Sequence, residues 1–364
     1  MAYTDIDKPS DYFETALWTG NGSTTNITSL DFQPDFTWIK GRSDAIAHVV
    51  FDSVRSAGGN KELTPNETYA EGGNSTISYG FLSSFNSDGF TVRNGTSSPN
   101  QADYTNKNSS TYASWNWKAG TSFTNDASAT GIGSIDSTGS VNQDAGFSIV
   151  SYTGTGSTGT VAHGLGATPS MMIFKERADD AHGWITYHHK NTSAPATEFL
   201  LLNTTQATED YADYFNDTAP TSSVFTIDTA GDINGSSDTY IAYCFAEKQG
   251  YSKFGSYTGN GNADGTFVYT GFKPAWVLIK WVGGTSDWYI YDNKINPFNV
   301  MSKVFAPNIA NAEITTSRLM DFTSNGFKNR GSGNTTNASG ENYIYMAFAE
   351  NPFVTSTGVP ATAR

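Results

Sequence analysis

The sequence predicts an all-β protein built from three tandem antiparallel β-sandwich domains of the jelly-roll or lectin-like kind. Three observations lead to this prediction: a phrase that recurs three times, a composition that favours strands and turns, and the lack of any long helical periodicity. Aromatic residues make up 14% of the chain and charged residues only 15%, and Gly, Ser, Thr and Asn dominate the remainder. Such a mixture suits short strands joined by turns and is poor for helices.

The recurring phrase has a Tyr-Thr-Gly-like turn, a strand that follows a proline and ends in a lysine, and an aromatic closing strand. Its landmarks are Gly20, Pro34 and Lys40, then Gly154, Pro169 and Lys175, then Gly259, Pro274 and Lys280. Proline and lysine both move by 135 positions between the first two copies, and all three landmarks move by 105 between the last two. Shared offsets indicate repeated structural units.

The offsets divide the chain into a first sandwich at residues 1–120, a second at 146–250 and a third at 251–364. A unit of about 105 residues is large enough to bury its own core. Residues 121–145 read TSFTNDASATGIGSIDSTGSVNQDA and contain few large side chains. This composition predicts a linker between the first two sandwiches.

Strands are predicted at residues 36–40, 47–52, 90–93 and 112–118 of the first unit. The segment from Phe85 to Phe90 predicts a turn, because Asn and Asp bond their own backbone and Gly89 can adopt a positive φ; residues 322–327 repeat it. The closing strands at 112–118, 240–247 and 343–350 are apolar at most positions, which is typical of central strands covered on both faces. The only helix candidate is residues 299–306.

Charge and cysteine content exclude several classes of protein. The 21 basic and 35 acidic residues give a net charge of −14, which opposes binding to nucleic acid and to anionic membranes. Cys244 is the only cysteine and lies in an apolar strand, so it is expected to be a small buried hydrophobe. No apolar stretch approaches the ~20 residues of a membrane helix, and the N-terminal residues do not resemble a signal peptide, so we expect folding in the cytosol.

Catalytic and metal-binding patterns are weak throughout the sequence. The five histidines are His48, His163, His182, His188 and His189. Two of them are adjacent and would point to opposite faces of a strand, so no metal site is predicted. Glu247 and Glu350 occupy equivalent strand ends, but the first unit has Lys118 there, and one carboxylate per unit does not form an acid/base pair.

Two acidic clusters leave calcium open, although neither has recognisable ligand spacing. They are residues 209–213 and 179–180. We therefore predict no enzyme activity, no cofactor and no metal.

Tryptophans are the residues that would stack on sugar rings if the protein binds glycans. Among the eight, Trp281 and Trp288 lie closest to polar turn sequences and are the candidate glycan contacts. The alternative is that these tryptophans belong to the core, which is the more common place for a tryptophan on a strand.

Several long stretches together resemble a known group of proteins. They are GFSIVSYTG at 146–154 with HGLG at 163–166, FNDTAPTSSVF at 215–225, KFGSYTGNG at 253–261, the N-terminal MAYT and DKPS, and the ending AFAENPF at 347–353. These stretches resemble virion proteins of marine tailed phages, built from tandem repeats of a poorly characterised β-sandwich domain and usually met among tail and fibre genes. The resemblance covers nearly the whole chain and carries over no functional residue.

The resemblance implies a place in the phage particle, assembled in the host cytoplasm, more than a reaction. The leading hypothesis is a non-enzymatic tail fibre or adhesin component that contacts the host surface, with a host glycan as a possible ligand. Its expected partners are other tail or capsid proteins and further copies of itself, with a trimer favoured. The alternatives are a capsid decoration protein and a polysaccharide depolymerase, which would need a groove with two carboxylates about 5 to 10 Å apart.

Overall fold

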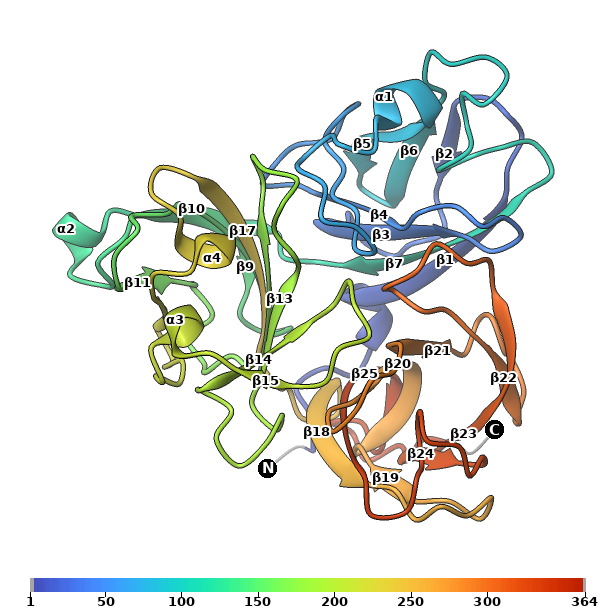
Figure 1. The fold of residues 1–364 in the computed structure, drawn as a ribbon. Helices are drawn as coiled ribbons and strands as arrows, with labels where there is room; N and C mark the ends of the chain where they lie inside the picture. Colours follow the sequence, from blue (N-terminus) through green and yellow to red (C-terminus); the bar gives the residue numbers. More distant parts are fainter. Residues whose placement is uncertain (1–2, 363–364) are drawn as a thin grey trace.

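The computed structural model describes residues 3–362, so residues 1–2 and 363–364, which begin and end the predicted repeats, lie outside the described part. Strands contain 41% of the residues and helices 5%, which confirms the all-β class. Figure 1 shows three lobes around a common centre, coloured blue to cyan, green to yellow, and orange to red. We call these lobes unit 1 (residues 3–120), unit 2 (121–250) and unit 3 (251–362).

Each unit has one sheet that faces the centre, which we call its inner sheet. In unit 1 this sheet has the order β1 (Phe13–Thr19), β7 (Thr111–Trp117), β3 (Phe36–Gly41), β4 (Val49–Asp52). In unit 2 the same order is β10 (Phe147–Thr153), β17 (Thr239–Phe245), β12 (Met171–Glu176), β13 (Ile185–His188), and in unit 3 it is β18 (Ser252–Thr258), β25 (Asn342–Pro352), β20 (Phe272–Trp281), β21 (Tyr289–Asp292). The strands pair antiparallel, and the recurring phrase supplies the first three strands of each order.

An outer sheet covers the other face of each inner sheet. The outer strands are β2 (Thr25–Ile27), β6 (Gly89–Arg93) and β5 (Phe81–Asn86) in unit 1, β11 (Gly159–Ala162) and β16 (Val224–Ile227) in unit 2, and β19 (Phe267–Tyr269), β24 (Gly326–Asn329), β23 (Ile314–Thr323) and β22 (Met301–Val304) in unit 3. The helices are single turns: η1 (Pro9–Asp11), α1 (Thr76–Tyr79), α2 (Ala127–Thr130), α3 (Ala212–Phe215) and α4 (Gly231–Asn234).

Two local predictions had opposite outcomes. The turn before Phe90 joins β5 to β6 as predicted, with Gly89 at φ 150°. The helix predicted at residues 299–306 is wrong, because β22 occupies this segment and pairs with β23. Met301 and Val304 are fully buried in the core of unit 3, so sheet pairing and burial outweigh the weak local preference for a helix.

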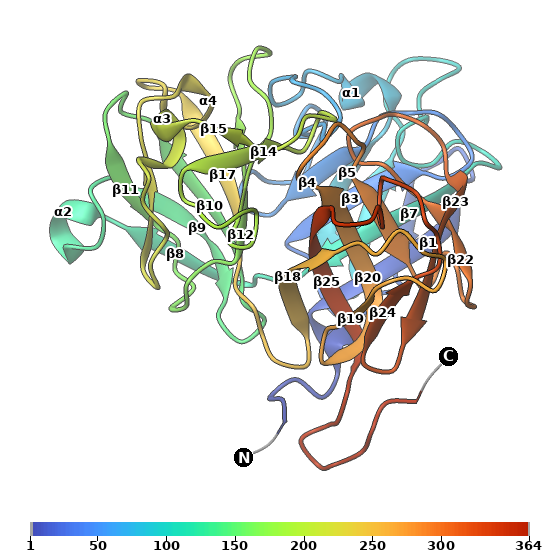
Figure 2. The ribbon, with the colours of Figure 1, turned by 60° about the horizontal axis from the view of Figure 1, so that its bottom comes forward.

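The closing strands are buried on both faces, as predicted. One face packs against the outer sheet of the same unit, and the other packs against the neighbouring units. On β17, Tyr240, Ala242 and Cys244 point into the core of unit 2, whereas Ile241 and Tyr243 point to the centre of the molecule. The central cluster takes side chains from all three units. Each sandwich has its own core, and the units also share a further one, so the sandwiches pack against one another and are not independent. Figure 2 shows the three lobes from a second direction.

Residues 121–145 do not form the predicted linker. They contain β8 (Thr121–Asn125), α2 and β9 (Ser137–Asn142), and β8 pairs with β9, which pairs with β10. The inner sheet of unit 2 therefore has eight strands, including β14 (Glu198–Leu201) and β15 (Glu209–Asp210) at the other end. A composition rich in Gly, Ser and Thr suits an exposed sheet edge as well as a flexible linker, so composition alone does not distinguish an edge strand from a linker.

Candidate functional site

The two tryptophans predicted to contact a glycan lie in different surroundings. Trp288 is only 1% exposed, so it cannot stack on a sugar, and the prediction is wrong for this residue. Trp281 is half-buried at the end of β20, and its Nε1–H donates to Glu341 Oε2 at 2.9 Å. Its ring packs so closely over Gly284 that a Cβ there would lie 2.4 Å from a ring atom. Trp281 therefore remains the accessible candidate.

Trp288 belongs to a set of three equivalent residues that join the units. Each immediately precedes β4, β13 or β21 and donates a ring N–H to a backbone carbonyl of the neighbouring unit. The pairs are His48 Nε2 with Ala306 O at 3.1 Å, Trp184 Nε1 with Thr64 O at 3.0 Å, and Trp288 Nε1 with Leu201 O at 3.0 Å. Unit 1 thus contacts unit 3, unit 2 contacts unit 1, and unit 3 contacts unit 2, which closes a ring.

His48 can replace a tryptophan in this set because its tautomer is determined by a second bond. Trp38 Nε1–H donates to His48 Nδ1 at 2.9 Å, so the proton of the neutral ring is on Nε2 and points at the Ala306 carbonyl. Burial holds the pKa of His48 well below its usual value, which keeps the ring neutral. This histidine is therefore a structural donor.

The lysines of the recurring phrase make the second connection of the same ring. Lys40, Lys175 and Lys280 have no exposed surface. Their Nζ groups donate to Ala310 O at 3.3 Å, Thr68 O at 2.9 Å and Thr205 O at 3.0 Å, each in the same neighbour that the ring N–H contacts. Burial lowers the pKa of Lys40 to about 7 and the pKa of Lys175 and Lys280 to about 8.

A third connection runs in the opposite direction. The backbone N–H groups of Glu313, Glu71 and Thr208 donate to the carbonyls of Arg42 at 2.8 Å, Arg177 at 2.9 Å and Val282 at 3.0 Å. Two of these sites add an ion pair, between Arg42 and Glu313 at 2.7 Å and between Arg177 and Glu71 at 2.8 Å. We call the ring N–H, lysine and backbone connections between two units a seam clasp. There are three seam clasps, one at each seam.

The far ends of β4, β13 and β21 contact the other neighbour. Asp52 Oδ2 accepts from Tyr243 O–H at 2.7 Å, His188 Nε2 lies 3.1 Å from Tyr345 O, and Asp292 Oδ2 accepts from Trp115 Nε1–H at 3.0 Å. Burial raises the pKa of Asp292, which nevertheless accepts four hydrogen bonds.

Asp52 also has a charged partner within its own unit. Arg55 Nε lies 2.6 Å from Asp52 Oδ2, and both side chains are fully buried. Asp52 and Asp292 therefore belong to the contacts between units, and Arg55 supports the first of them.

The remaining candidate catalytic residues stay apart. Glu247 pairs with Lys253 at 2.6 Å and Glu350 with Lys273 at 3.2 Å, each at its own strand end. Within residues 3–362, no group of three His, Cys, Asp or Glu side chains is placed to hold a metal ion. The same part of the chain contains no helix that is long and apolar enough to cross a membrane.

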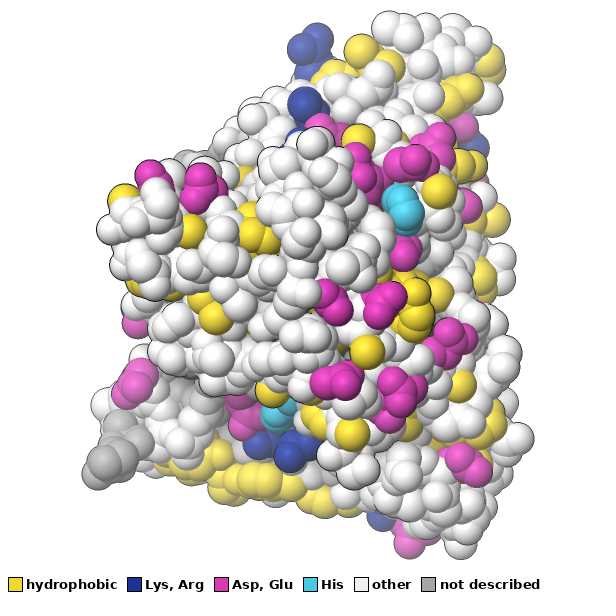
Figure 3. All heavy atoms as spheres, turned by 60° about the vertical axis from the view of Figure 1, so that its left-hand side comes forward, with side chains coloured by type: hydrophobic (Ala, Val, Ile, Leu, Met, Phe, Trp, Pro, Cys, Tyr) yellow, Lys and Arg dark blue, Asp and Glu magenta, His cyan; other side chains and the backbone are white. Residues whose placement is uncertain are grey.

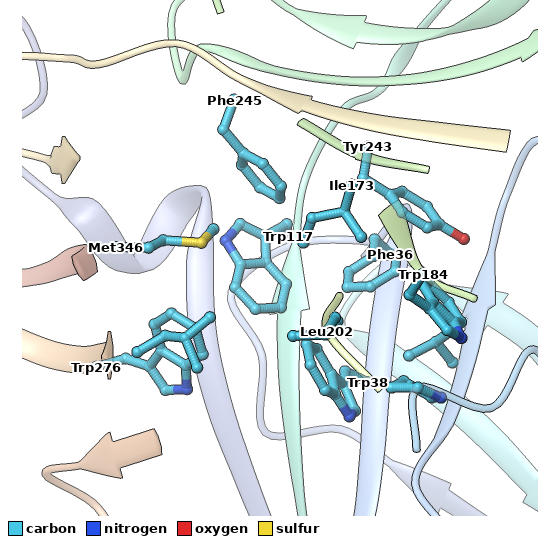
Figure 4. Close-up of a pocket in the computed structure, with 13 residues that line it drawn as sticks. Phe36, Trp38, Trp117, Ile173, Trp184, Leu202, Tyr243, Phe245, Trp276 and Met346 are labelled. Carbon is cyan, nitrogen blue, oxygen red and sulfur yellow. The ribbon is translucent and has the colours of Figure 1, made fainter. Parts of the chain in front are cut away.

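A small cavity lies at the centre of the molecule, where the three inner sheets meet (Figure 4). Its volume is about 20 Å³, and its walls are apolar side chains from every unit, among them Trp117, Tyr243 and Trp276. A space of this size is close to the minimum for one water molecule. Its apolar walls offer a water molecule no hydrogen-bond partners. It is a packing defect of the shared core.

An open groove of about 510 Å³ lies between units 1 and 3. Its polar lining consists of Ser10, Glu14, Thr15, Asn293, Lys294, Glu350 and Asn351. Glu14 pairs with Lys294 at 2.7 Å, and Asn293 Nδ2–H donates to Glu350 at 2.6 Å. Sequence reasoning missed this groove because its two walls are about 280 residues apart along the chain.

The net negative charge is concentrated in unit 2. Residues 121–250 contain 15 acidic and 4 basic residues, whereas residues 251–364 contain 7 acidic and 9 basic ones. Figure 3 shows acidic side chains in magenta spread over the face on the left of Figure 1, with few basic ones. This face would repel phosphate groups and acidic polymers.

Comparison with known families places the chain in one of them. The family model described as "Domain of unknown function (DUF7483)" matches residues 8–352. The chain belongs to this family. The match extends over all three units in one piece, in agreement with the shared core. A search of curated proteins found no match.

Proposed function

We propose that this chain is a non-enzymatic structural component of a phage particle, in a tail fibre or adhesin that contacts the host surface. The observation that supports this most is the ring of three seam clasps. They join three sandwiches through buried donors and main-chain acceptors, which gives one rigid body without a disulfide. Such a body suits a particle that must survive outside a cell, and the virion resemblance of the sequence points the same way.

The arrangement of the units bears on the expected oligomer. A threefold-symmetric oligomer is built from three chains around one axis, whereas here three related units lie in a single chain. The proposed self-association as a trimer would therefore combine nine sandwiches. Light scattering of the purified protein distinguishes a mass of 39.2 kDa from a multiple of it.

A threefold-like body also supports a second position, as a decoration protein over a threefold site of a capsid lattice. Electron cryomicroscopy of particles separates the two proposals. Density for this chain at the tail supports the fibre or adhesin, density over the capsid supports decoration, and absence of the chain from purified particles rejects both.

Within the described part of the chain, the groove between units 1 and 3 favours the depolymerase alternative, because Glu14 and Glu350 both line it. Both carboxylates are paired with lysines, at 2.7 Å and 3.2 Å. Incubation with host surface polysaccharide tests this alternative. Chain shortening that disappears in Glu14→Gln or Glu350→Gln would replace the non-enzymatic proposal.

A further inference from the structure

One surface loop of unit 3 holds a phenylalanine in solvent. Phe298 is 79% exposed, more than any other large hydrophobic residue of the described chain, and Val300 beside it is 45% exposed. The loop joins β21 to β22 and begins at Asn293, which lines the groove between units 1 and 3.

The loop is fixed at both ends of this apolar tip. Asn296 Oδ1 accepts from the backbone N–H groups of Ser302 at 3.2 Å and Lys303 at 3.1 Å. Asn299 bonds both backbone groups of Phe322, with its Nδ2–H donating to the carbonyl at 2.7 Å and its Oδ1 accepting from the N–H at 3.0 Å. Ile295, at the base of the loop, is buried in the shared core. Hydrogen bonds on both sides of Phe298 therefore hold the loop in place while the phenylalanine side chain is exposed to solvent.

Phe298 directly follows a residue of the polar groove in the chain. Pro297, the residue before Phe298, is itself part of the groove wall. The neighbouring wall offers two carboxylates, two amides, an ammonium and two hydroxyls, from Glu14, Glu350, Asn293, Asn351, Lys294, Ser10 and Thr15. An apolar ring beside clustered donors and acceptors matches a sugar, whose C–H face stacks on aromatics while its hydroxyls bond to carboxylates and amides.

The charges of the groove select among sugars. Glu14 is balanced by Lys294 at 2.7 Å and Glu350 by Lys273 at 3.2 Å, so the groove has little net charge. An acidic glycan would gain no unpaired cation there. A neutral glycan needs none.

We propose that the groove between units 1 and 3, together with Phe298, binds a short segment of a neutral polysaccharide. This site rests on the proposed adhesin function and names its ligand class and its surface. It differs from the site expected from the sequence, since Trp281 and Trp288 do not line this groove.

Affinity electrophoresis of the full chain through gels containing dextran or galactan tests the proposal, with dextran sulfate as the anionic probe. We expect retardation by at least one neutral polymer and none by dextran sulfate. Phe298→Ala should weaken retardation about tenfold, the usual effect of losing one aromatic stacking contact. Phe267→Ala is the matched control, because Phe267 is 46% exposed on the same unit and does not line the groove.

The outcomes separate this inference from the proposed function. No retardation by either neutral polymer, or equal retardation of the Phe298→Ala and unaltered proteins, overturns the sugar site. Location of the chain at the tail of imaged particles would leave the adhesin proposal standing in that case. If Phe298→Ala reduces adsorption to host cells without any effect on retardation, the ligand at the loop is a protein and the sugar proposal is wrong.

Discussion

The seam clasps make a quantitative prediction for Trp184→Phe. The indole Nε1–H of Trp184 donates to the buried carbonyl of Thr64 at 3.0 Å, across the seam between units 2 and 1. Phenylalanine keeps an aromatic ring but leaves this carbonyl without its donor, which costs about 1–3 kcal/mol. The smaller ring also leaves a void worth about 1 kcal/mol. We therefore expect unfolding free energy to fall by about 2–4 kcal/mol.

The assay combines urea denaturation with hydrogen exchange resolved along the chain. Because the lost bond joins two units, exchange should increase in unit 1 around Thr64 as well as in unit 2. Trp18→Phe is the matched control, since Trp18 Nε1–H donates to Thr105 O, also at 3.0 Å, but within unit 1. Its effect should stay within unit 1. Unchanged protection of unit 1 in Trp184→Phe would refute the idea that the clasp couples the units.

Three further predictions concern a buried lysine, an ion pair between units and the cysteine. Burial lowers the pKa of Lys175 to about 8 from 10.5, so the folded state binds fewer protons than the unfolded state between these pH values. The free energy of unfolding should therefore rise with pH across this window by at most about 3 kcal/mol. Urea denaturation at a series of pH values should show a smaller rise for Lys175→Met. Arg42→Ala should cost about 1–2 kcal/mol, and a double-mutant cycle with Glu313→Ala should show coupling across their 2.7 Å ion pair; additive effects would show that the pair contributes nothing. Burial raises the pKa of the Cys244 thiol, so a thiol reagent should label it only on unfolding, and rapid labelling of the native protein would contradict its burial.

Sequence offsets predicted the repeated strands but not how the units meet. The lysines at 40, 175 and 280 were recognised as landmarks, and their burial was not expected because lysine at a strand end normally reaches water. A second signal was present in the sequence. Asn66, Asn203 and Asn308 follow the lysines by 26, 28 and 28 residues, and each side chain accepts the backbone N–H of His48, Trp184 or Trp288. Recurring asparagines at such spacing mark the loop that reaches the neighbour.

Other features had no local signal. Residues 121–145 have the composition of a linker, yet β8 and β9 are held by pairing with β10, a contact that depends on the rest of unit 2. Trp288 lies near polar turn sequence, but the loop of unit 2 that buries it is about 87 residues away in the chain. Glu14 and Lys294 meet only because the ring of units closes. Long-range contacts of this kind follow from the assembled fold and not from periodicity or composition.

The seam clasps explain how three diverged units can keep one geometry. Every acceptor of the ring N–H and lysine connections is a backbone carbonyl, two positions before or after the recurring asparagine. Main-chain acceptors persist whatever side chains the loop carries, so Thr64, Leu201 and Ala306 are equivalent despite their different chemistry.

The donors are more restricted than the acceptors, because each must present an N–H at the end of a long side chain inside an apolar core. Histidine and tryptophan satisfy the first position, and lysine occupies the second in all three units. The Arg–Glu pairs, by contrast, occur at two seams and are replaced by Val282 and Thr208 at the third, where the backbone bond alone remains. The buried connections are therefore the part of the seam that all three units share, and the ion pairs at its rim strengthen two of the three seams.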